Sequence, residues 1–388
     1  FTYPVYTMRL LGVTLALCLV GVAVSVPTAK QMRQLAGEKA VKQAEDCEAY
    51  PCVVFEDQFN SFDFSKWEHE ITAGGGGNWE FQYYTNNRSN SYVRDGHLFI
   101  KPTLTEDKYG AGFVTSGVLN IWGHQPHNLC TGQAWWGCER AGTPDNAINP
   151  VASARLRTSN SFFFNYGRID VVARMPKGDW LWPAIWMLPR YNEYGDWPAS
   201  GEIDIVESRG NLDYKDEGGE DRGYTHAGQT LHWGPYLPYN GYYLTTGSKD
   251  DATFGDAMHT YSVIWDDEQM QFLIDDEEVF TADPGESGFW DYGDFGLPEE
   301  TNPWVGGGKM APFDKPFYII LNVAAGGTNG YFPDSWTNAA YPKPWSNESP
   351  TGPRDFWNAV DLWYPTWEGE SAAMEIDSVV VYKLQEDP

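Results

Sequence analysis

The chain has 388 residues and a formal net charge of −28, which argues against nucleic acids as ligands because phosphate-rich partners require clustered Lys and Arg. Aromatic residues make up 16% of the sequence, and its 40 Gly and 25 Pro predict many turns rather than long helices. A mostly β protein with a neutral ligand fits this composition. The 18 Trp residues suit sugar rings, whose apolar faces stack on indoles, although core packing must account for many of them.

The N-terminal stretch has the pattern of a targeting segment. Met8-Arg9 precedes an apolar run from Leu10 to Val26, and small residues follow up to Ala29. This order predicts a secretory signal peptide over residues 1–29, with residues before Met8 as a translated leader. A membrane anchor fits less well, because a run of about 17 residues is at the short limit for a spanning helix and no Lys or Arg cluster follows. We therefore expect a secreted, extracellular protein that does not bind membranes.

The remaining chain divides into a short segment and one domain. Residues 30–46 are charged and Ala-rich, typical of a propeptide or an exposed segment, and residues 47–388 form a single predicted domain. Four Cys remain after the signal, and they allow three disulfide pairings. The local pairs Cys47 with Cys52 and Cys130 with Cys138 are favoured, because each closes a short loop in a secreted protein.

From Cys52 onward, short β-type runs alternate with turn signals. The first run begins at Val53, and Asp95-Gly96 lies between two further runs, which is a strong hairpin signal. The later runs cover residues 162–164, 167–174, 182–188, 201–207, 261–265, 270–274, 317–323 and 374–384. This spacing predicts an all-β, two-sheet sandwich. Long loops are expected at 106–150, 211–252 and 283–313, and loops of this length are usually functional.

One predicted strand, residues 201–207, carries three carboxyl groups. Glu202 and Asp204 share a face, but Glu207 lies five residues beyond Glu202 and would point away in a regular strand. A one-residue β-bulge around Ile205-Val206 would return Glu207 to that face. A solvated polar face or a calcium loop is the alternative, but the aliphatic residues between the acids require burial, which argues against a loop. Three carboxyl groups would then line one cleft.

Paired carboxyl groups can hydrolyse glycosidic bonds, with retention of configuration when they lie roughly 5 to 5.5 Å apart. The stretch Gly201-Glu-Ile-Asp-Ile-Val-Glu207 resembles the signature of glycoside hydrolase family 16, in the bulged form of laminarinase-like endo-β-1,3-glucanases of invertebrate animals. Further blocks follow the order found in that family, namely Phe81–Arg88, Asp95–Leu98, Trp182–Leu188, Leu231–Pro235, His259–Tyr261 and Leu321–Gly327. The resemblance implies a jelly-roll, concanavalin A-like sandwich with long loops around a concave cleft.

The resemblance also implies roles for individual residues. Glu202 would be the nucleophile, Glu207 the acid/base and Asp204 an assisting carboxyl group. The candidate substrate-binding residues are Asn86, Arg88, Trp182, Trp186, Trp197, His232, Trp233 and Asn322. Core packing is the alternative for the Trp residues, surface polarity for Asn86 and Arg88, and a buried structural role for His232.

Some members of the family hold a structural calcium ion near the first and last strands. Glu56, Gly96 and Asp377 occupy matching positions, and hard oxygen ligands suit calcium, although ordinary surface polarity explains them equally well. No motif indicates a catalytic metal or an organic cofactor.

The expected function is that of a secreted endo-β-1,3-glucanase, acting with retention through a covalent glycosyl-enzyme intermediate, with β-1,3-glucan as partner and a monomer as the default state. One alternative is a non-catalytic β-glucan recognition protein, which shares the fold but usually lacks the two glutamates and carries an extra N-terminal domain. Another is a β-glucan transglycosylase. The presence of all three acids, and the short segment between the signal and Cys47, favour the enzyme.

Overall fold

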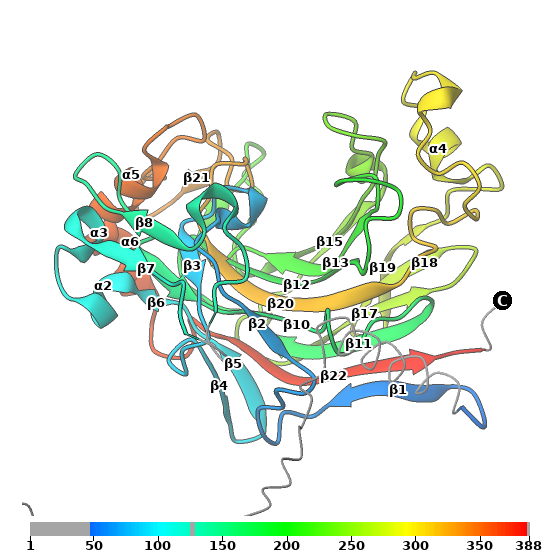
Figure 1. Ribbon diagram of the computed structural model, residues 1–388, viewed down its shortest axis with the longest axis horizontal. Helices are drawn as coiled ribbons and strands as arrows, with labels where there is room; N and C mark the ends of the chain where they lie inside the picture. Colours follow the sequence, from blue (N-terminus) through cyan, green and yellow to red (C-terminus); the bar gives the residue numbers. More distant parts are fainter. Residues whose placement is uncertain (1–46, 125–128, 386–388) are drawn as a thin grey trace, which may run out of the picture.

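The computed structural model describes residues 47–124 and 129–385. The predicted signal peptide at 1–29 and the segment 30–46 lie outside the described residues. Two curved β-sheets are stacked as layers, and loops with short helices rise above the upper sheet (Figure 1). The all-β sandwich expected from the sequence is confirmed. Within the described ranges, no helix is both long and apolar enough to span a membrane.

The lower sheet has eight strands in the order β19-β18-β17-β11-β22-β5-β4, with β1 also paired to β22. Along β11, buried residues alternate with partly exposed ones, so Ile169, Val171 and Ala173 face the core. The strands are β1 (Cys52–Asp57), β4 (Ser91–Arg94), β5 (His97–Ile100), β11 (Gly167–Arg174), β17 (His259–Trp265), β18 (Met270–Ile274), β19 (Glu277–Ala282) and β22 (Met374–Lys383).

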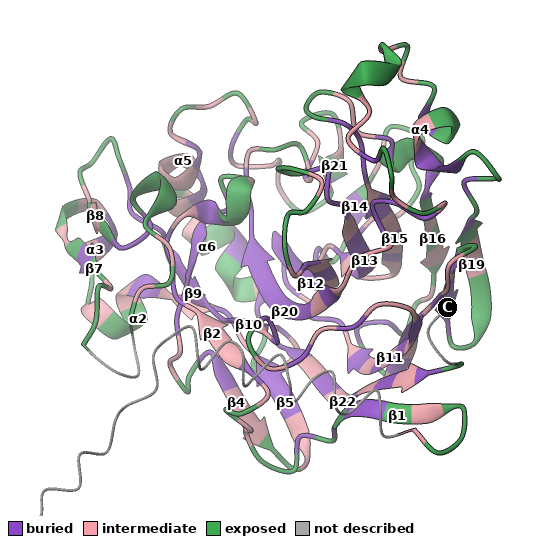
Figure 2. Cartoon of the chain, turned by 45° about the vertical axis from the view of Figure 1, so that its right-hand side comes forward, coloured by how far each residue is buried: buried purple, intermediate pink, exposed green. Residues whose placement is uncertain are grey.

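The upper sheet has seven strands in the order β16-β15-β13-β12-β20-β10-β2. Its central strands β12 and β20 pair over nine residues from Leu181 to Pro189, and almost every residue of β20 is buried (Figure 2). The strands are β2 (Glu68–Glu70), β10 (Arg155–Arg157), β12 (Leu181–Pro189), β13 (Glu202–Ser208), β15 (His226–His232), β16 (Thr246–Asp250) and β20 (Phe317–Ala325). The main core lies between the two sheets.

Two local predictions have different outcomes. The hairpin at Asp95-Gly96 is confirmed, and both residues have positive φ, as the tight turn between β4 and β5 requires. The run at 162–164 was wrong as a strand, since only an isolated bridge joins Phe164 to Phe317. Phe162 and Phe164 are buried in the core, so their hydrophobicity reflects packing rather than strand pairing.

The expected loop at 211–252 was also wrong, because it contains strands β15 and β16. In β15 the buried positions are Ala227, Gln229 and Leu231, so the alternation is regular but includes a polar residue and a small one. Hydrophobicity alone therefore gives no strand signal there. The expected loops at 106–150 and 283–313 contain only short elements.

Short elements extend the sandwich at both ends (Figure 1). They are β3 (Gln82–Tyr84), α2 (Thr105–Tyr109), α3 (Phe113–Ser116), β6 (Thr103–Leu104), β7 (Val118–Asn120), η2 (Ala134–Trp136), β8 (Glu139–Ala141), β9 (Val151–Ser153), β14 (Tyr214–Lys215), α4 (Gly288–Gly293), β21 (Thr337–Asn338), α5 (Gly352–Asn358) and α6 (Val360–Trp363). Residues 105–124 and 129–148 form a lobe, whose Val114, Leu119, Ala147 and Ile148 share a small apolar cluster with Ala73, Tyr83 and Ala152. Both predicted disulfides are present, and Cys130–Cys138 closes the loop that carries η2.

Candidate functional site

The three predicted acids lie on β13, and a β-bulge brings them to one cleft. Asp204 pairs with Thr230 of β15, and Glu207 pairs with Gly228. The two residues between the acids, Ile205 and Val206, therefore face one residue of β15, Gln229. The register with β12 shifts at the same place. The predicted bulge at Ile205-Val206 is thus confirmed, and all three carboxyl groups line one cavity in the upper sheet.

A buried amide stabilises this bulge. The Gln229 side chain donates from Nε2 to the Ile205 carbonyl oxygen at 2.8 Å. Ile205, Val206 and Gln229 are fully buried, so the carbonyl group that the bulge removes from the strand ladder has no access to water. Gln229 therefore holds the bulge in the conformation that points Glu207 into the cleft.

Replacing Gln229 with Met is expected to lower the free energy of unfolding by about 1–3 kcal/mol, because the buried Ile205 carbonyl loses its donor. The measurement is urea denaturation. Gln269→Met is the control, since Gln269 is exposed and the change should alter stability by less than about 0.5 kcal/mol. Equal stability of the two variants would contradict a supporting role for Gln229.

Indole groups orient the two glutamates. Trp197 donates from Nε1 to Glu202 Oε2 at 2.9 Å, and Trp182 donates from Nε1 to Glu207 Oε1 at 2.6 Å. The Trp182 ring is stacked on Tyr331 with centroids 3.8 Å apart and is only 7% exposed, so its face is covered. Trp182 therefore acts as a hydrogen-bond donor to Glu207 rather than as a free stacking surface, whereas Trp197 is 41% exposed.

His232 faces Asp204, with Nε2 at 3.3 Å from Asp204 Oδ2. Asn240 Oδ1 accepts from two backbone N–H groups, those of Trp233 and Tyr242, so its Nδ2 faces His232 Nδ1 at 2.9 Å. Nδ1 must then be the acceptor, which places the imidazole proton on Nε2, toward Asp204.

Trp233 is placed differently from the expectation. Its side chain is fully buried, donates to Thr245 Oγ1 at 2.8 Å and packs against Phe289. Successive residues of a strand point to opposite faces, so the residue after His232 points into the core. The assignment of Trp233 to the substrate-binding surface was therefore wrong.

Burial raises the pKa of all three carboxyl groups. For Glu202, burial and the neighbouring Asp204 carboxyl raise the pKa to about 8. Burial and the Glu207 carboxyl hold the pKa of Asp204 well above its usual range. Burial also raises the pKa of Glu207, although hydrogen bonding from Trp182 opposes the change. At neutral pH at least one of these groups therefore carries a proton that it can donate.

The other wall of the cleft comes from strands β12, β20 and β10. Trp186 donates from Nε1 to Asn322 Oδ1 at 2.7 Å, so both residues lie in the cleft as expected. Arg155 lies over the Trp186 ring at 5.2 Å and is within 3.9 Å of the Glu80 carboxylate.

Three residues that line the cleft were not predicted from the sequence, namely Arg155, Glu80 and Asn78. The available signal was the alternation of Arg155 and Arg157 around Leu156, which is typical of a strand with one polar face.

Asn86 and Arg88 are not among the residues that line the cavity at the three acids. Arg88 donates to the Asn86 carbonyl oxygen at 2.8 Å, and its guanidinium lies over Phe62 at 4.5 Å from the ring centroid. These contacts hold Arg88 against the aromatic side chain of Phe62, and a role in sugar binding stays a prediction.

The predicted calcium ligands are engaged by protein groups. Glu56 accepts from Gln58 at 2.8 Å, and Asp377 lies 3.4 Å from His97 and accepts from Ser378. Calcium at this place stays a prediction. Among the described residues, the only group of three His, Cys, Asp or Glu side chains close enough to hold a metal ion is Glu202, Asp204 and His232, in the cleft itself.

The fold and site define a class of protein. It is a β-sandwich whose upper sheet carries carboxyl groups, indole rings and a guanidinium in one cleft. Carboxyl groups and a guanidinium bind hydroxyl groups, and indole faces stack on pyranose rings, so the class suits uncharged polysaccharides.

Comparisons with known proteins place this chain within that class. The family model for glycosyl hydrolases family 16 matches residues 146–303. A protein of Penaeus monodon named beta-1,3-glucan-binding protein is 52% identical over 89% of this chain and 94% of its own length. The chain belongs to glycosyl hydrolase family 16.

Further relatives are named either as glucan-binding proteins or as glucan-hydrolysing enzymes. Beta-1,3-glucan-binding protein 1 of Galleria mellonella is 33% identical over 86% of this chain, which spans 64% of that relative's length. A glucan endo-1,3-beta-glucosidase of Cryptopygus antarcticus is 33% identical over 70% of this chain and 80% of its own length. The laminarinase structure from Rhodothermus marinus has a TM-score of 0.53 at 24% identity, covering 87% of this chain and all of that one, which shows the shared fold.

Proposed function

We propose that this protein recognises β-1,3-glucan and binds the polysaccharide in the cleft above β13. The observation that carries the proposal is the cleft itself, in which the Trp186 and Trp197 rings lie beside the carboxyl groups and the Arg155 guanidinium. This set supplies stacking surfaces and hydrogen-bonding groups for an uncharged sugar. The name of the 52% identical relative supports β-1,3-glucan as the particular ligand. Secretion and a monomeric state are part of the same proposal.

Replacing Trp186 with Ala is expected to weaken laminarin binding about tenfold or more, because a partly buried indole in the middle of a binding site contributes over 1 kcal/mol. Titration calorimetry with laminarin measures the affinity. Trp186→Phe keeps an aromatic face and should retain most of it, which separates stacking from a general disturbance of the cleft. Unchanged affinity in Trp186→Ala would overturn the proposed position of the ligand.

A second candidate function is hydrolysis of the bound glucan with retention of configuration. The observation that favours it is the intact set of Glu202, Asp204 and Glu207 on the bulged strand, with an indole donor on each glutamate. The endo-1,3-beta-glucosidase name of one relative also supports it.

In this reaction a Glu202 carboxylate oxygen attacks the anomeric carbon while Glu207 gives its proton to the leaving glycosidic oxygen. Glu207 then takes a proton from a water molecule, which attacks the anomeric carbon and releases Glu202 as a carboxylate. Burial and the Asp204 carboxyl raise the pKa of Glu202 to about 8, so Glu202 must lose its proton before it can attack, and hydrolysis depends on the fraction of Glu202 that is ionised. The hydrogen bond that Glu202 shares with Asp204 opposes the rise in the pKa of Asp204 and favours the proton on Glu202. A sugar hydroxyl in place of water would give transglycosylation.

Product analysis on laminarin, lichenan and curdlan distinguishes the two functions. Retaining hydrolysis gives shorter β-1,3-linked products from laminarin, and transfer would add products longer than the starting oligosaccharides. A protein that binds laminarin and releases no products is a recognition protein only. Failure to bind laminarin at all would overturn both functions.

A further inference from the structure

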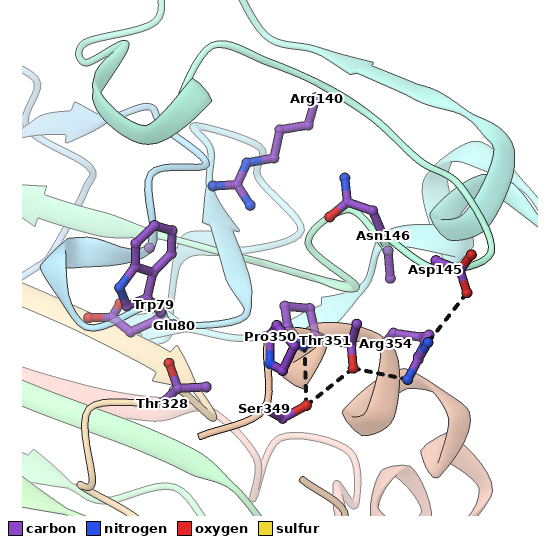
Figure 3. Close-up of a pocket in the computed structure, with 13 residues that line it drawn as sticks. Trp79, Glu80, Arg140, Asp145, Asn146, Thr328, Ser349, Pro350, Thr351 and Arg354 are labelled. Atoms are coloured by element: carbon purple, nitrogen blue, oxygen red, sulfur yellow. Dashed lines mark hydrogen bonds and ion pairs between the residues drawn. The ribbon is translucent and has the colours of Figure 1, made fainter. Parts of the chain in front are cut away.

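Two adjoining cavities lie at the lobe formed by residues 105–124 and 129–148, and the first of them also borders the loop that precedes α5. The first, of about 340 Å³, is lined by Trp79, Glu80, Arg140 and Thr351, among others (Figure 3). The second, of about 390 Å³, shares Trp79 and Arg140 with it and adds Trp136. Glu80 lines both the first cavity and the cleft at the three acids, so the two spaces are neighbours at this residue.

The aromatic residues at these cavities are unusually exposed. Trp79 and Trp136, which line the cavities, are 49% and 68% exposed. Trp135 lines neither cavity, is 56% exposed, and has its ring centroid 5.0 Å from that of Trp79. Large apolar side chains grouped at the surface of a soluble protein are typical of a binding site. Indole rings that are open to solvent on one face can stack on pyranose rings.

The loop that carries two of these rings is held rigidly. Cys130–Cys138 closes it, and Gly137 is packed so tightly that a Cβ atom there would lie 2.2 Å from the Gly132 carbonyl oxygen. Trp135 and Trp136 both have positive φ, a conformation that non-Gly residues rarely adopt. A rigid loop loses little conformational entropy when a ligand binds, which favours affinity.

Arg140 supplies a hydrogen-bond donor to the same space. Its guanidinium extends toward Trp79 across the cavity (Figure 3), and Nη2 donates to the Trp135 carbonyl oxygen at 2.8 Å. Its Nε atom is buried and has no hydrogen-bond partner, and none of the ion pairs among the described residues includes Arg140. Because Arg140 lines both cavities, the N–H groups of its guanidinium that face them can donate to sugar hydroxyl groups.

From these contacts we propose a distal glucan subsite, in which Trp79 and Trp136 stack on sugar units of a chain that leaves the cleft past Glu80, and Arg140 donates to their hydroxyl groups. This inference rests on the proposed function. With this subsite the affinity for glucan depends on chain length, because short oligosaccharides occupy the cleft alone whereas longer chains also reach the lobe.

The test compares laminaritriose with laminariheptaose and laminarin by titration calorimetry. The double variant Trp79→Ala/Trp136→Ala is expected to bind the longer ligands about tenfold more weakly and laminaritriose as the wild type does. Trp122→Ala is the matched control, because Trp122 is a 47% exposed Trp of the same lobe that lines neither cavity. Arg140→Met is a second variant, expected to weaken only the longer ligands.

The outcomes separate this subsite from the proposed function. If the wild type binds no laminarioligosaccharide, the proposed function fails. If the wild type binds laminariheptaose and the double variant binds it equally well, the distal subsite alone is overturned. Equal losses for laminaritriose and laminariheptaose would also overturn it, since they would indicate a general disturbance of the cleft. Melting temperatures show whether each variant is folded.

Discussion

Replacing Glu202 or Glu207 with Gln is expected to reduce laminarin cleavage at least about 1,000-fold, because each amide removes a group that makes or breaks a bond in the reaction. Binding should change less than about threefold, since Gln keeps the size of the side chain and can still accept from Trp197 or Trp182. The measurements are reducing-sugar release and calorimetry on the same preparations.

Added azide distinguishes the two glutamates. In Glu202→Gln a small anion can take the place of the missing nucleophile and give a product of inverted configuration. Comparable turnover in either variant would remove that residue from the mechanism. A wild type that releases no product under the same conditions, while it binds laminarin, would overturn the hydrolytic function and leave recognition as the function of the cleft.

A second large effect is expected on the free energy of unfolding when Glu202 is replaced. Glu202→Gln is expected to raise the free energy of unfolding by about 2 kcal/mol at pH 7.5, with the gain shrinking as the pH is lowered toward 4.5. The pKa of Glu202 is raised from 4.5 to about 8 by burial and by Asp204. Between these values the native group stays protonated while the unfolded chain ionises, so wild-type stability falls as the pH rises through this window. Solvent screening makes the gain smaller than the full pKa change implies, because the side chain is only partly buried at the cleft surface.

Urea denaturation at several pH values between 4.5 and 8 measures this difference. Glu217→Gln serves as the control, because Glu217 is exposed in a loop and its replacement removes the same charge. A gain in Glu202→Gln that is independent of pH, or equal to that of Glu217→Gln, would contradict a raised Glu202 pKa.

Much of the site follows from local sequence rules. The two-residue period of a strand places Glu202 and Asp204 together, and it makes Glu207 an exception that only a bulge resolves. The disulfides follow from short loops, and the Asp95-Gly96 turn from the positive φ values that Asp and Gly tolerate. These features depend on neighbours in the chain, and each is found in the structure.

The remaining features depend on which strands become neighbours. Arg155 reaches the cleft because β10 pairs with β20, where it lies opposite Asn322, and no local pattern fixes that register. Gln229 is a polar residue whose burial is compensated by donation to the carbonyl oxygens of Ile205 and Leu273, which lie on two other strands. Trp182 resembles a sugar-stacking residue in the sequence, but Tyr331 covers its face and leaves its N–H for Glu207.

The sequence by itself therefore determined the sandwich class, the acidic strand and its bulge, because strand periodicity and turn chemistry act over a few residues. Tertiary structure alone decided what surrounds the acids and where the cavities beside Trp79 and Trp136 lie. The physical reason is that hydrogen-bond partners, burial and the resulting pKa changes come from strands and loops that are distant in the chain.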